Sequence, residues 1–181
     1  MNYRPMTSFL SEESIKAHIE YMRGERLRHS IDEKSFPEIK GMSPREISKI
    51  NLKRSVKSEI LRRKTNICLH ECYFSSFVQV ASPCKAIKKF YSSEDAFLYE
   101  ILLLARDTDF GFVYVCLDER GRPSIRLSKE NSYTFIKDTP LLALDVCEHA
   151  YFSDYGFDKE KYLRGALLHF DLTKLALDTA K

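Results

Sequence analysis

The stretch that decides the fold is residues 141–151, which read LLALDVCEHAY. Its first half is a short apolar run, which is typical of a buried strand, and Asp145 stands near the end of that run. His149 follows four residues later, so that one oxygen and one imidazole nitrogen could reach the same metal ion. This mixed donor set suits iron, manganese or zinc. Such a pair also arises by chance, so the rest of the chain has to support it.

Two further histidines lie on predicted helices in the first half of the chain. Residues 11–29 favour a helix, because Ser11 can cap its start and apolar residues recur on the face that carries His18. Residues 32–42 contain a proline and a glycine and are typical of a linker. A second helical region is expected to break once, restart, and run through His70 to about residue 80. The two long helices would then present His18 and His70 to each other.

The start of that second region carries a recognisable helix signal. Ser43 is an expected N-cap, Pro44 occupies the first helical position, and Glu46 completes a capping box. The segment from Arg45 to Lys64 holds eight basic residues against two acidic ones. Such a surface could bind nucleic-acid phosphates, but aromatic residues that would stack on bases are missing from it. We therefore expect a solvated helix face and no nucleic-acid partner.

The pattern changes after Pro83 from long helices to a helix followed by strands. We expect a helix from Ser92 to about Arg106 and a last helix from Asp158 to about Ala176. A hairpin turn at residues 119–122 joins two of the three expected strands. The strands are residues 110–117, 124–127 and 141–146. This order predicts an α+β fold, with an N-terminal helical-hairpin domain (1–84) and a C-terminal domain (85–181) whose small antiparallel sheet is flanked by helices.

Residues 140–155 resemble the C-terminal signature of the iron/manganese superoxide dismutases, which reads D-V-W-E-H-A-Y-Y where this chain has residues 145–152. The resemblance continues through residues 161–163. Upstream, residues 10–18 resemble the segment that leads to the family's first ligand histidine, and residues 69–74 its N-H-x-x-F-W segment. Residues 111–115 stand in the place of its G-W-x-W-L strand. The similarity touches nearly the whole chain and agrees with the expected fold.

The resemblance implies a metal centre and an activity. The ligands would be His18, His70, Asp145 and His149, which would hold one iron or manganese ion per subunit beside a solvent molecule. In the family the metal alternates between the +3 and +2 states and disproportionates superoxide to dioxygen and hydrogen peroxide. Carboxylate and imidazole ligands accept both states, and an open position admits a small anion.

The residues around the implied ligands depart from the family. Met22 replaces a histidine, Arg26 replaces the gateway tyrosine, and Phe152 replaces a tyrosine that reaches the partner subunit. The chain has no tryptophan, and the places of the family's tryptophans near the metal are taken by Phe74, Phe112 and Cys147. Apolar volume is partly kept, while the hydrogen-bonded relay for proton delivery is lost. We therefore expect a metal site with slow turnover, in which Arg26 lies near the entrance and attracts superoxide.

Three other positions have implied roles. Asn66 matches the iron-type position of the amide that contacts the bound solvent, and Asn131 lies close to the manganese-type position. Both side chains are shorter than the family's glutamine, so these residues do not decide between the two metals. Glu148 is retained where the family's glutamate reaches the partner's ligand histidine, which implies a homodimer.

Composition places the chain among globular proteins of a reducing compartment. It has 181 residues, of which 44% are hydrophobic, and no apolar run approaches the length of a membrane span. The start of the chain lacks the apolar core of a secretion signal. Its five cysteines lack the spacing of a disulfide framework. We expect a cytoplasmic protein without a membrane partner.

Two hypotheses of different classes follow. The first is a metal-dependent superoxide dismutase, with slow turnover. The second is a superoxide-dismutase-like fold of weak or no activity that serves an interaction or assembly role, or another redox role through Cys72 or Cys147. Four retained ligands favour the first, because a buried ligand set without metal would leave polar groups poorly satisfied.

Overall fold

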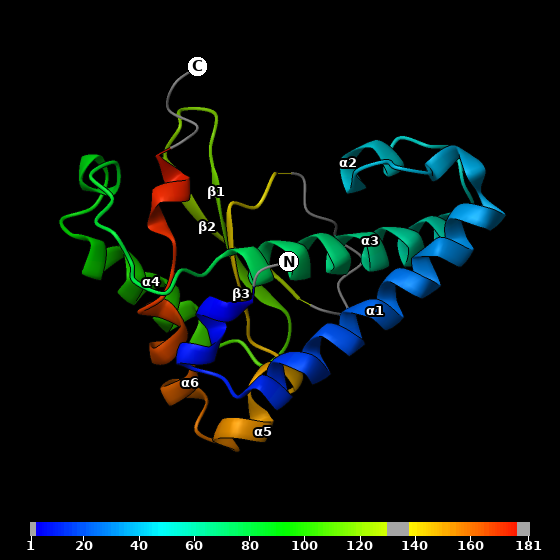
Figure 1. Cartoon of the computed structure of the whole chain (residues 1–181). Coiled ribbons are helices and arrows are strands. Elements are labelled where there is room, and N and C mark those ends of the chain that lie inside the picture. Colours follow the sequence, from blue (N-terminus) through cyan, green and yellow to red (C-terminus); the bar gives the residue numbers. More distant parts are fainter. Residues whose placement is uncertain (1–2, 130–137, 177–181) are drawn as a thin grey trace.

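The computed structural model describes residues 3–129 and 138–176. Two long helices, α1 (Glu12–Ser35) and α3 (Arg54–Ser75), lie side by side as a hairpin, and the short α2 (Pro44–Ile47) lies at its far end (Figure 1). The rest of the chain forms a small sheet with helices α4 (Glu94–Arg106), α5 (Phe152–Tyr155) and α6 (Lys159–Leu167). The predicted α+β class is confirmed.

Helix α1 begins as the sequence predicted and ends later. The Ser11 side chain accepts a hydrogen bond from the backbone N–H of Ser14, which caps the first turn. The helix continues to Ser35 rather than to residue 29, because the first strong helix breaker after Gly24 is Pro37. The predicted linker therefore starts later than expected, and contains a 3-10 turn at Pro37–Ile39.

The second helical region breaks and restarts as expected. Ser43 and Glu46 form the predicted capping box at the start of α2. Helix α3 begins at Arg54, after six intervening residues. Helix α3 ends at Ser75, short of the expected residue 80. Ser76 ends the helix. Its hydroxyl donates a 2.8 Å hydrogen bond to the Cys72 carbonyl and accepts a 2.8 Å hydrogen bond from the backbone N–H of Ala143.

The sheet has three antiparallel strands in the order β2-β1-β3. These are β1 (Phe112–Leu117), β2 (Pro123–Ser128) and β3 (Leu142–Asp145), each within two residues of its predicted bounds. Gly121, at φ +70°, allows the turn between β1 and β2, where Asp118 accepts backbone hydrogen bonds. Helix α3 packs against the outer edge of β3 and so covers an edge that would otherwise be open.

The final helix is shorter than predicted. Helix α6 ends at Leu167, and a separate 3-10 helix spans Leu172–Leu175. Between them the backbone pairs with the segment after α3: the N–H of Val78 donates to the His169 carbonyl at 2.8 Å, and that of Asp171 to the Ser76 carbonyl at 2.9 Å. A continuous helix would have used these backbone groups internally, so the tertiary pairing ends it.

Two hydrophobic clusters lie at opposite ends of the helical hairpin. The main core joins side chains from both halves of the chain, such as Ile15, Leu69 and Leu144. The smaller cluster consists of Ile39, Ile47, Ile60 and Leu61. The division into domains at residue 84 stays a prediction. Among the described residues, no helix combines the length and apolar character needed to span a bilayer.

The hairpin is polar between its two clusters. Glu25 and His29 of α1 are buried there, and on α3 Arg63 forms an ion pair with Asp32. Nδ1 of His29 lies 3.6 Å from a carboxylate oxygen of Asp32, and Nε2 lies 3.6 Å from a carboxylate oxygen of Glu33. Neither nitrogen makes a hydrogen bond. This polar segment separates the main core from the small one.

Replacing Ser76 by alanine should destabilise the protein by about 1–3 kcal/mol, because the buried N–H of Ala143 would lose its acceptor. Urea unfolding followed by circular dichroism measures this change. Ser58→Ala is the control, since that hydroxyl also donates to a helix carbonyl but is exposed. Equal free energies of unfolding for the two variants would contradict the role assigned to Ser76.

Candidate metal centre

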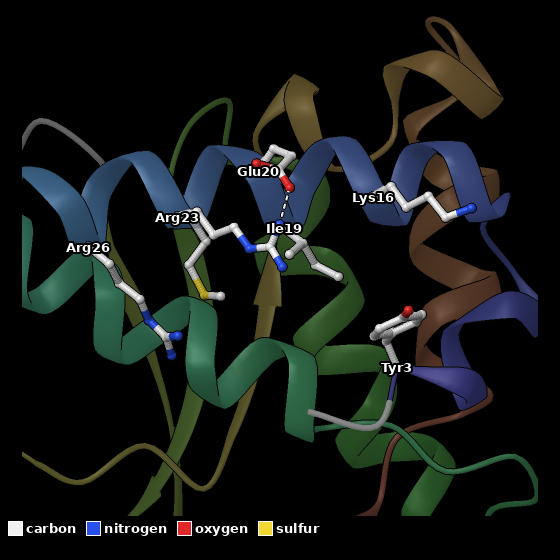
Figure 2. Close-up of a pocket in the computed structure, with 7 residues that line it drawn as sticks. Tyr3, Lys16, Ile19, Glu20, Arg23 and Arg26 are labelled. Atoms are coloured by element: carbon white, nitrogen blue, oxygen red, sulfur yellow. Dashed lines mark hydrogen bonds and ion pairs between the residues drawn. The ribbon is translucent and has the colours of Figure 1, made fainter.

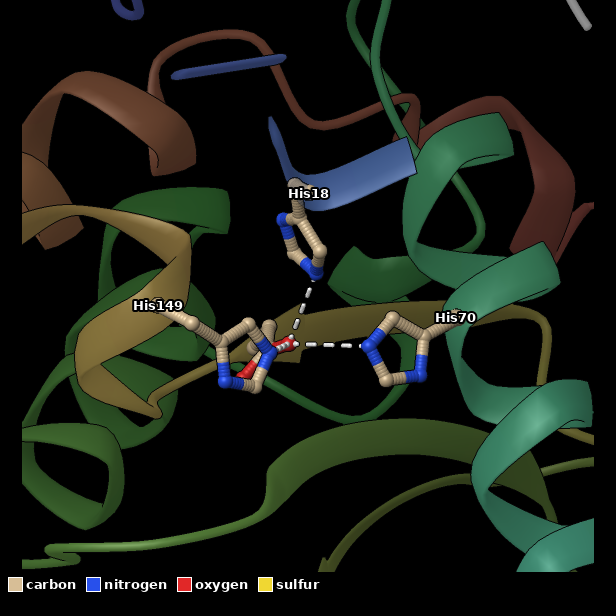
Figure 3. A group of neighbouring side chains, drawn as sticks. His18, His70 and His149 are labelled. Carbon is tan, nitrogen blue, oxygen red and sulfur yellow. Dashed lines mark hydrogen bonds and ion pairs between the residues drawn. The ribbon is translucent and has the colours of Figure 1, made fainter. Parts of the chain in front are cut away.

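Four side chains from four separate elements converge on one point, and Figure 3 shows the three imidazoles directed toward it. His18 comes from α1, His70 from α3, Asp145 from the end of β3, and His149 from the 3-10 turn Glu148–Ala150. One potential ligand atom of each residue lies within 4.8 Å of those of the others. The structure brings together all four residues that the sequence predicted as ligands.

The carboxylate of Asp145 stands at the centre of the group. Its Oδ2 atom lies 3.0 Å from Nε2 of His149, 3.1 Å from Nε2 of His18 and 3.5 Å from Nε2 of His70. Its other oxygen, Oδ1, accepts a 2.9 Å hydrogen bond from the backbone N–H of Cys147. The turn after β3 therefore holds the carboxylate with one oxygen toward the three imidazoles.

The local fold fixes this corner of the sheet. Asp145 pairs with Phe112 in the antiparallel register, and the N–H of Val146 donates to the Gly111 carbonyl. The Tyr162 hydroxyl donates 2.8 Å to the carbonyl of Asp145. Cys147 lies against the backbone of Gly111, whose N–H points at the sulfur from 3.1 Å. The Cys147 side chain thus packs the turn after β3 against the residue that precedes β1.

Apolar side chains enclose most of the centre. His18, His70 and Asp145 are almost completely buried, while 26% of the His149 side chain is exposed. The His18 ring contacts the rings of Tyr73 and Phe74, with centroids about 5 Å apart, and the His70 ring contacts Phe112 edge-on. Such walls keep bulk water out and strengthen electrostatic interactions inside.

Burial and charge set the protonation of the cluster. Burial lowers the pKa of His70 to about 4 and also lowers the pKa of His18, although Asp145 opposes both shifts. Burial alone would raise the pKa of Asp145, but the imidazoles of His149 and His18, whose Nε2 atoms lie 3.0 Å and 3.1 Å from its Oδ2, hold the pKa well below its usual range. Neutral imidazoles beside an ionised carboxylate are the forms that bind a cation.

The ring nitrogens of His18 and His70 form a donor set that fits a metal ion. His70 Nδ1 bonds the Asn66 carbonyl at 2.8 Å, which leaves Nε2 as the atom that faces the cluster. That Nε2 atom and both ring nitrogens of His18 are buried without a hydrogen-bond partner. The two Nε2 atoms nevertheless lie 3.5 Å and 3.1 Å, for His70 and His18, from Oδ2 of Asp145. Buried polar atoms are normally paired, and a cation between the ligand atoms would satisfy the Nε2 atoms of His18 and His70.

The other predicted site residues have different positions. Asn66 is buried beside His70, and its amide nitrogen has no hydrogen-bond partner. Asn131 lies outside the described residues. Arg26 is about half exposed and forms a 2.7 Å ion pair with Glu71.

Arg26 and Met22 line a pocket of about 290 Å³ along α1. Figure 2 shows Tyr3 facing helix α1 and the Arg26 side chain directed away from the helix axis. The remaining lining residues are Tyr3, Lys16, Ile19, Glu20 and Arg23. Each of its three basic residues forms an ion pair: Lys16 with Glu12, Arg23 with Glu20 and Arg26 with Glu71. The role predicted for Arg26 stays a prediction.

One residue of the centre was missed by the sequence reasoning. The ring of Tyr21 stacks on His149 with centroids 4.3 Å apart and lies 5.5 Å from the His70 ring. Tyr21 follows His18 by three residues on a predicted helix, which places both on neighbouring parts of one face. The three-residue spacing from His18 was the sequence signal that could have placed Tyr21 near the centre.

Comparison with known proteins agrees with this geometry. The family described as "Iron/manganese superoxide dismutases, C-terminal domain" matches residues 81–175, which is more than half of the chain and includes Asp145 and His149. A curated relative, the superoxide dismutase [Fe] of Cupriavidus metallidurans, is 29% identical over 115 residues. This alignment covers 60% of the chain and 58% of the relative. The chain belongs to the iron/manganese superoxide dismutase family.

Proposed function

We propose that the protein is a superoxide dismutase that uses one iron or manganese ion per subunit and converts superoxide to dioxygen and hydrogen peroxide. The observation that carries the proposal is the convergence of three imidazole Nε2 atoms on one oxygen of the buried Asp145. Family membership supports the same activity. The chain matches only 58% of the length of its curated relative, so activity, substrate and partners are proposals.

The proposed ligands are His18, His70, Asp145 and His149, which together form a mixed nitrogen and oxygen set. Bound iron or manganese would supply one-electron exchange between its +3 and +2 states. The protein's part is to keep the imidazoles of His18 and His70 neutral and the carboxylate of Asp145 ionised, and to exclude bulk water from three of the four ligands. Asn66 is proposed to orient a solvent molecule, which its unpartnered amide nitrogen supports. Asn131 stays a second candidate for that role.

Slow turnover is part of the proposal. Peroxide formation consumes protons, and Met22 is a buried thioether that has none to give. Arg26 is held by Glu71 rather than lying against a ligand ring. Arg26, about half exposed, is proposed to attract the superoxide anion, which raises its local concentration without supplying protons.

The second candidate function, a weakly active or inactive relative with an interaction role, is favoured by exposed aromatic residues. Phe152 and Phe157 contact each other at 5.3 Å, and 93% of Phe157 is exposed. A redox role through cysteine has less support. Burial raises the pKa of Cys72 to about 11, so its reactive thiolate form is scarce, and Cys147 contacts the backbone of Gly111.

We also propose a homodimer through the surface that carries Glu148. Glu148 is exposed on the same turn as His149, and the exposed pair Phe152 and Phe157 follows it closely in the chain. An aromatic pair beside a polar rim is typical of the centre of a protein interface.

A cytoplasmic location and the absence of a nucleic-acid partner complete the proposal. All five cysteines are free thiols, which suits a reducing compartment. In the basic segment, Arg62 forms an ion pair with Glu59 and Arg63 with Asp32. These pairs reduce the charge available to phosphates.

Replacing His149 by alanine should lower metal occupancy by at least about tenfold and abolish superoxide decay, because the centre loses one of four donors. Protein reconstituted separately with iron and with manganese is assayed for metal content and for superoxide decay on the same samples. His169→Ala is the control, since this half-buried imidazole lies outside the cluster. Unchanged occupancy in His149→Ala would rule out the proposed site. Full occupancy of the unaltered protein without decay would favour the second candidate.

Replacing Phe157 by serine should convert a dimer into monomers of 21.1 kDa, because the variant loses an aromatic contact at the proposed interface. Light scattering after size-exclusion chromatography measures the mass. Tyr99→Ser, which removes another exposed aromatic ring on α4, should leave the dimer intact. A monomeric unaltered protein, or a dimeric Phe157→Ser, would contradict the proposed interface.

A further inference from the structure

Tyr21 occupies the exposed side of the metal centre. Its ring is nearly parallel to that of His149, with an interplanar angle of 25° and centroids 4.3 Å apart. The same ring lies 5.5 Å from His70, so it contacts two of the four proposed ligands. We propose that Tyr21 is a positioning residue, whose ring holds the His149 imidazole in the orientation that a metal ligand needs.

His149 needs such support more than the other ligands do. His18 and His70 stand on helices of 24 and 22 residues, and Asp145 ends a strand that is paired in the sheet. His149 stands on a 3-10 turn of three residues and is the most exposed of the four side chains. A turn of three residues constrains its side chain less than a long helix or a paired strand does.

The neighbouring rings show how the support is divided. His18 contacts the rings of Tyr73 and Phe74, and His70 lies against Phe112. Among the described aromatic residues, Tyr21 is the one ring from outside the ligand set that contacts His149. The flat contact fixes the plane of the imidazole, and this plane determines the direction of its Nε2 lone pair.

Helix α1 makes the contact rigid. Tyr21 stands one turn beyond His18, so the same helix carries one ligand and the ring that supports another. The helix also packs against the turn that bears His149. Movement of α1 relative to that turn would disturb both ligands together, which links the orientation of the N-terminal hairpin to the C-terminal part of the centre.

Tyr21 differs in position from the residues that the family resemblance implied. The gateway tyrosine corresponds to Arg26, whose guanidinium pairs with Glu71. Tyr21 acts through its ring face and through His149. A phenylalanine should therefore replace it, whereas an aliphatic side chain should not.

The inference rests on the proposed function in one respect, namely that the four residues bind a metal ion. Cobalt(II) is a suitable probe, because its visible absorption bands report the number and geometry of its ligands, and its affinity can be measured without any assay of superoxide. The comparison uses Tyr21→Phe, which keeps the ring, and Tyr21→Leu, which keeps apolar volume without a flat face. Tyr99→Leu is the control for loss of a tyrosine elsewhere.

We expect Tyr21→Leu to bind cobalt(II) about 10–100-fold more weakly and to shift its visible bands, the range typical for residues that orient metal ligands. Tyr21→Phe should restore the affinity and spectrum of the unaltered protein. Thermal unfolding of the metal-free proteins checks that the leucine variant is folded. If that variant unfolds, Tyr21→Met provides a flexible apolar replacement with the same expectation.

The outcomes separate this inference from the proposed function. Equal affinity and spectrum in the aliphatic variants overturn the role of Tyr21 and leave the dismutase proposal standing. Cobalt binding that depends on Tyr21, in a protein whose iron and manganese forms do not consume superoxide, supports the role of Tyr21 and overturns the dismutase. An unaltered protein that binds no cobalt(II) overturns the role of Tyr21 together with the metal centre.

Discussion

An ionised carboxylate is costly to bury, and Asp145 is fully buried where the sheet, both long helices and the turn after β3 meet. One of its oxygens is satisfied by the backbone N–H of Cys147, and the other faces three imidazoles. Tyr162 fixes the backbone carbonyl of the same residue. The arrangement of the hairpin over the sheet therefore has to keep positive or polar partners at this point.

The elements that carry Asp145 and its neighbouring histidines could be predicted from the sequence. The strand before Asp145 and the helices around His18 and His70 carry strong periodic patterns, and the family resemblance supplied the way in which they meet. The residues at which the helices end were predicted less well. Helix α3 stops at a serine whose acceptor role depends on Ala143, far away in the chain. The final helix ends because its backbone pairs with residues after α3, a tertiary contact that no local pattern encodes.

The surroundings of the centre were predicted unevenly for a similar reason. Substitutions at family positions, such as Met22 and Phe112, can be identified from the sequence, and both side chains are buried in the core. Tyr21 corresponds to none of the family positions considered, so only the packing of α1 against the turn after β3 places its ring on His149. The replacement of a family histidine by Met22 thus coexists with an aromatic contact that the family pattern did not suggest.

The small cluster of Ile39, Ile47, Ile60 and Leu61 gives the end of the hairpin a stability of its own. Between it and the main core lie Glu25, His29 and Arg63, which contribute little apolar burial and retain unsatisfied polar atoms. A polar segment of this kind weakens the cooperativity between two cores. The tip of the hairpin can then open and close as a separate unit, with amide hydrogens that exchange sooner than those around Asp145. Changes in the sequence of α2 and its loops are correspondingly free to accumulate without disturbing the four proposed metal ligands.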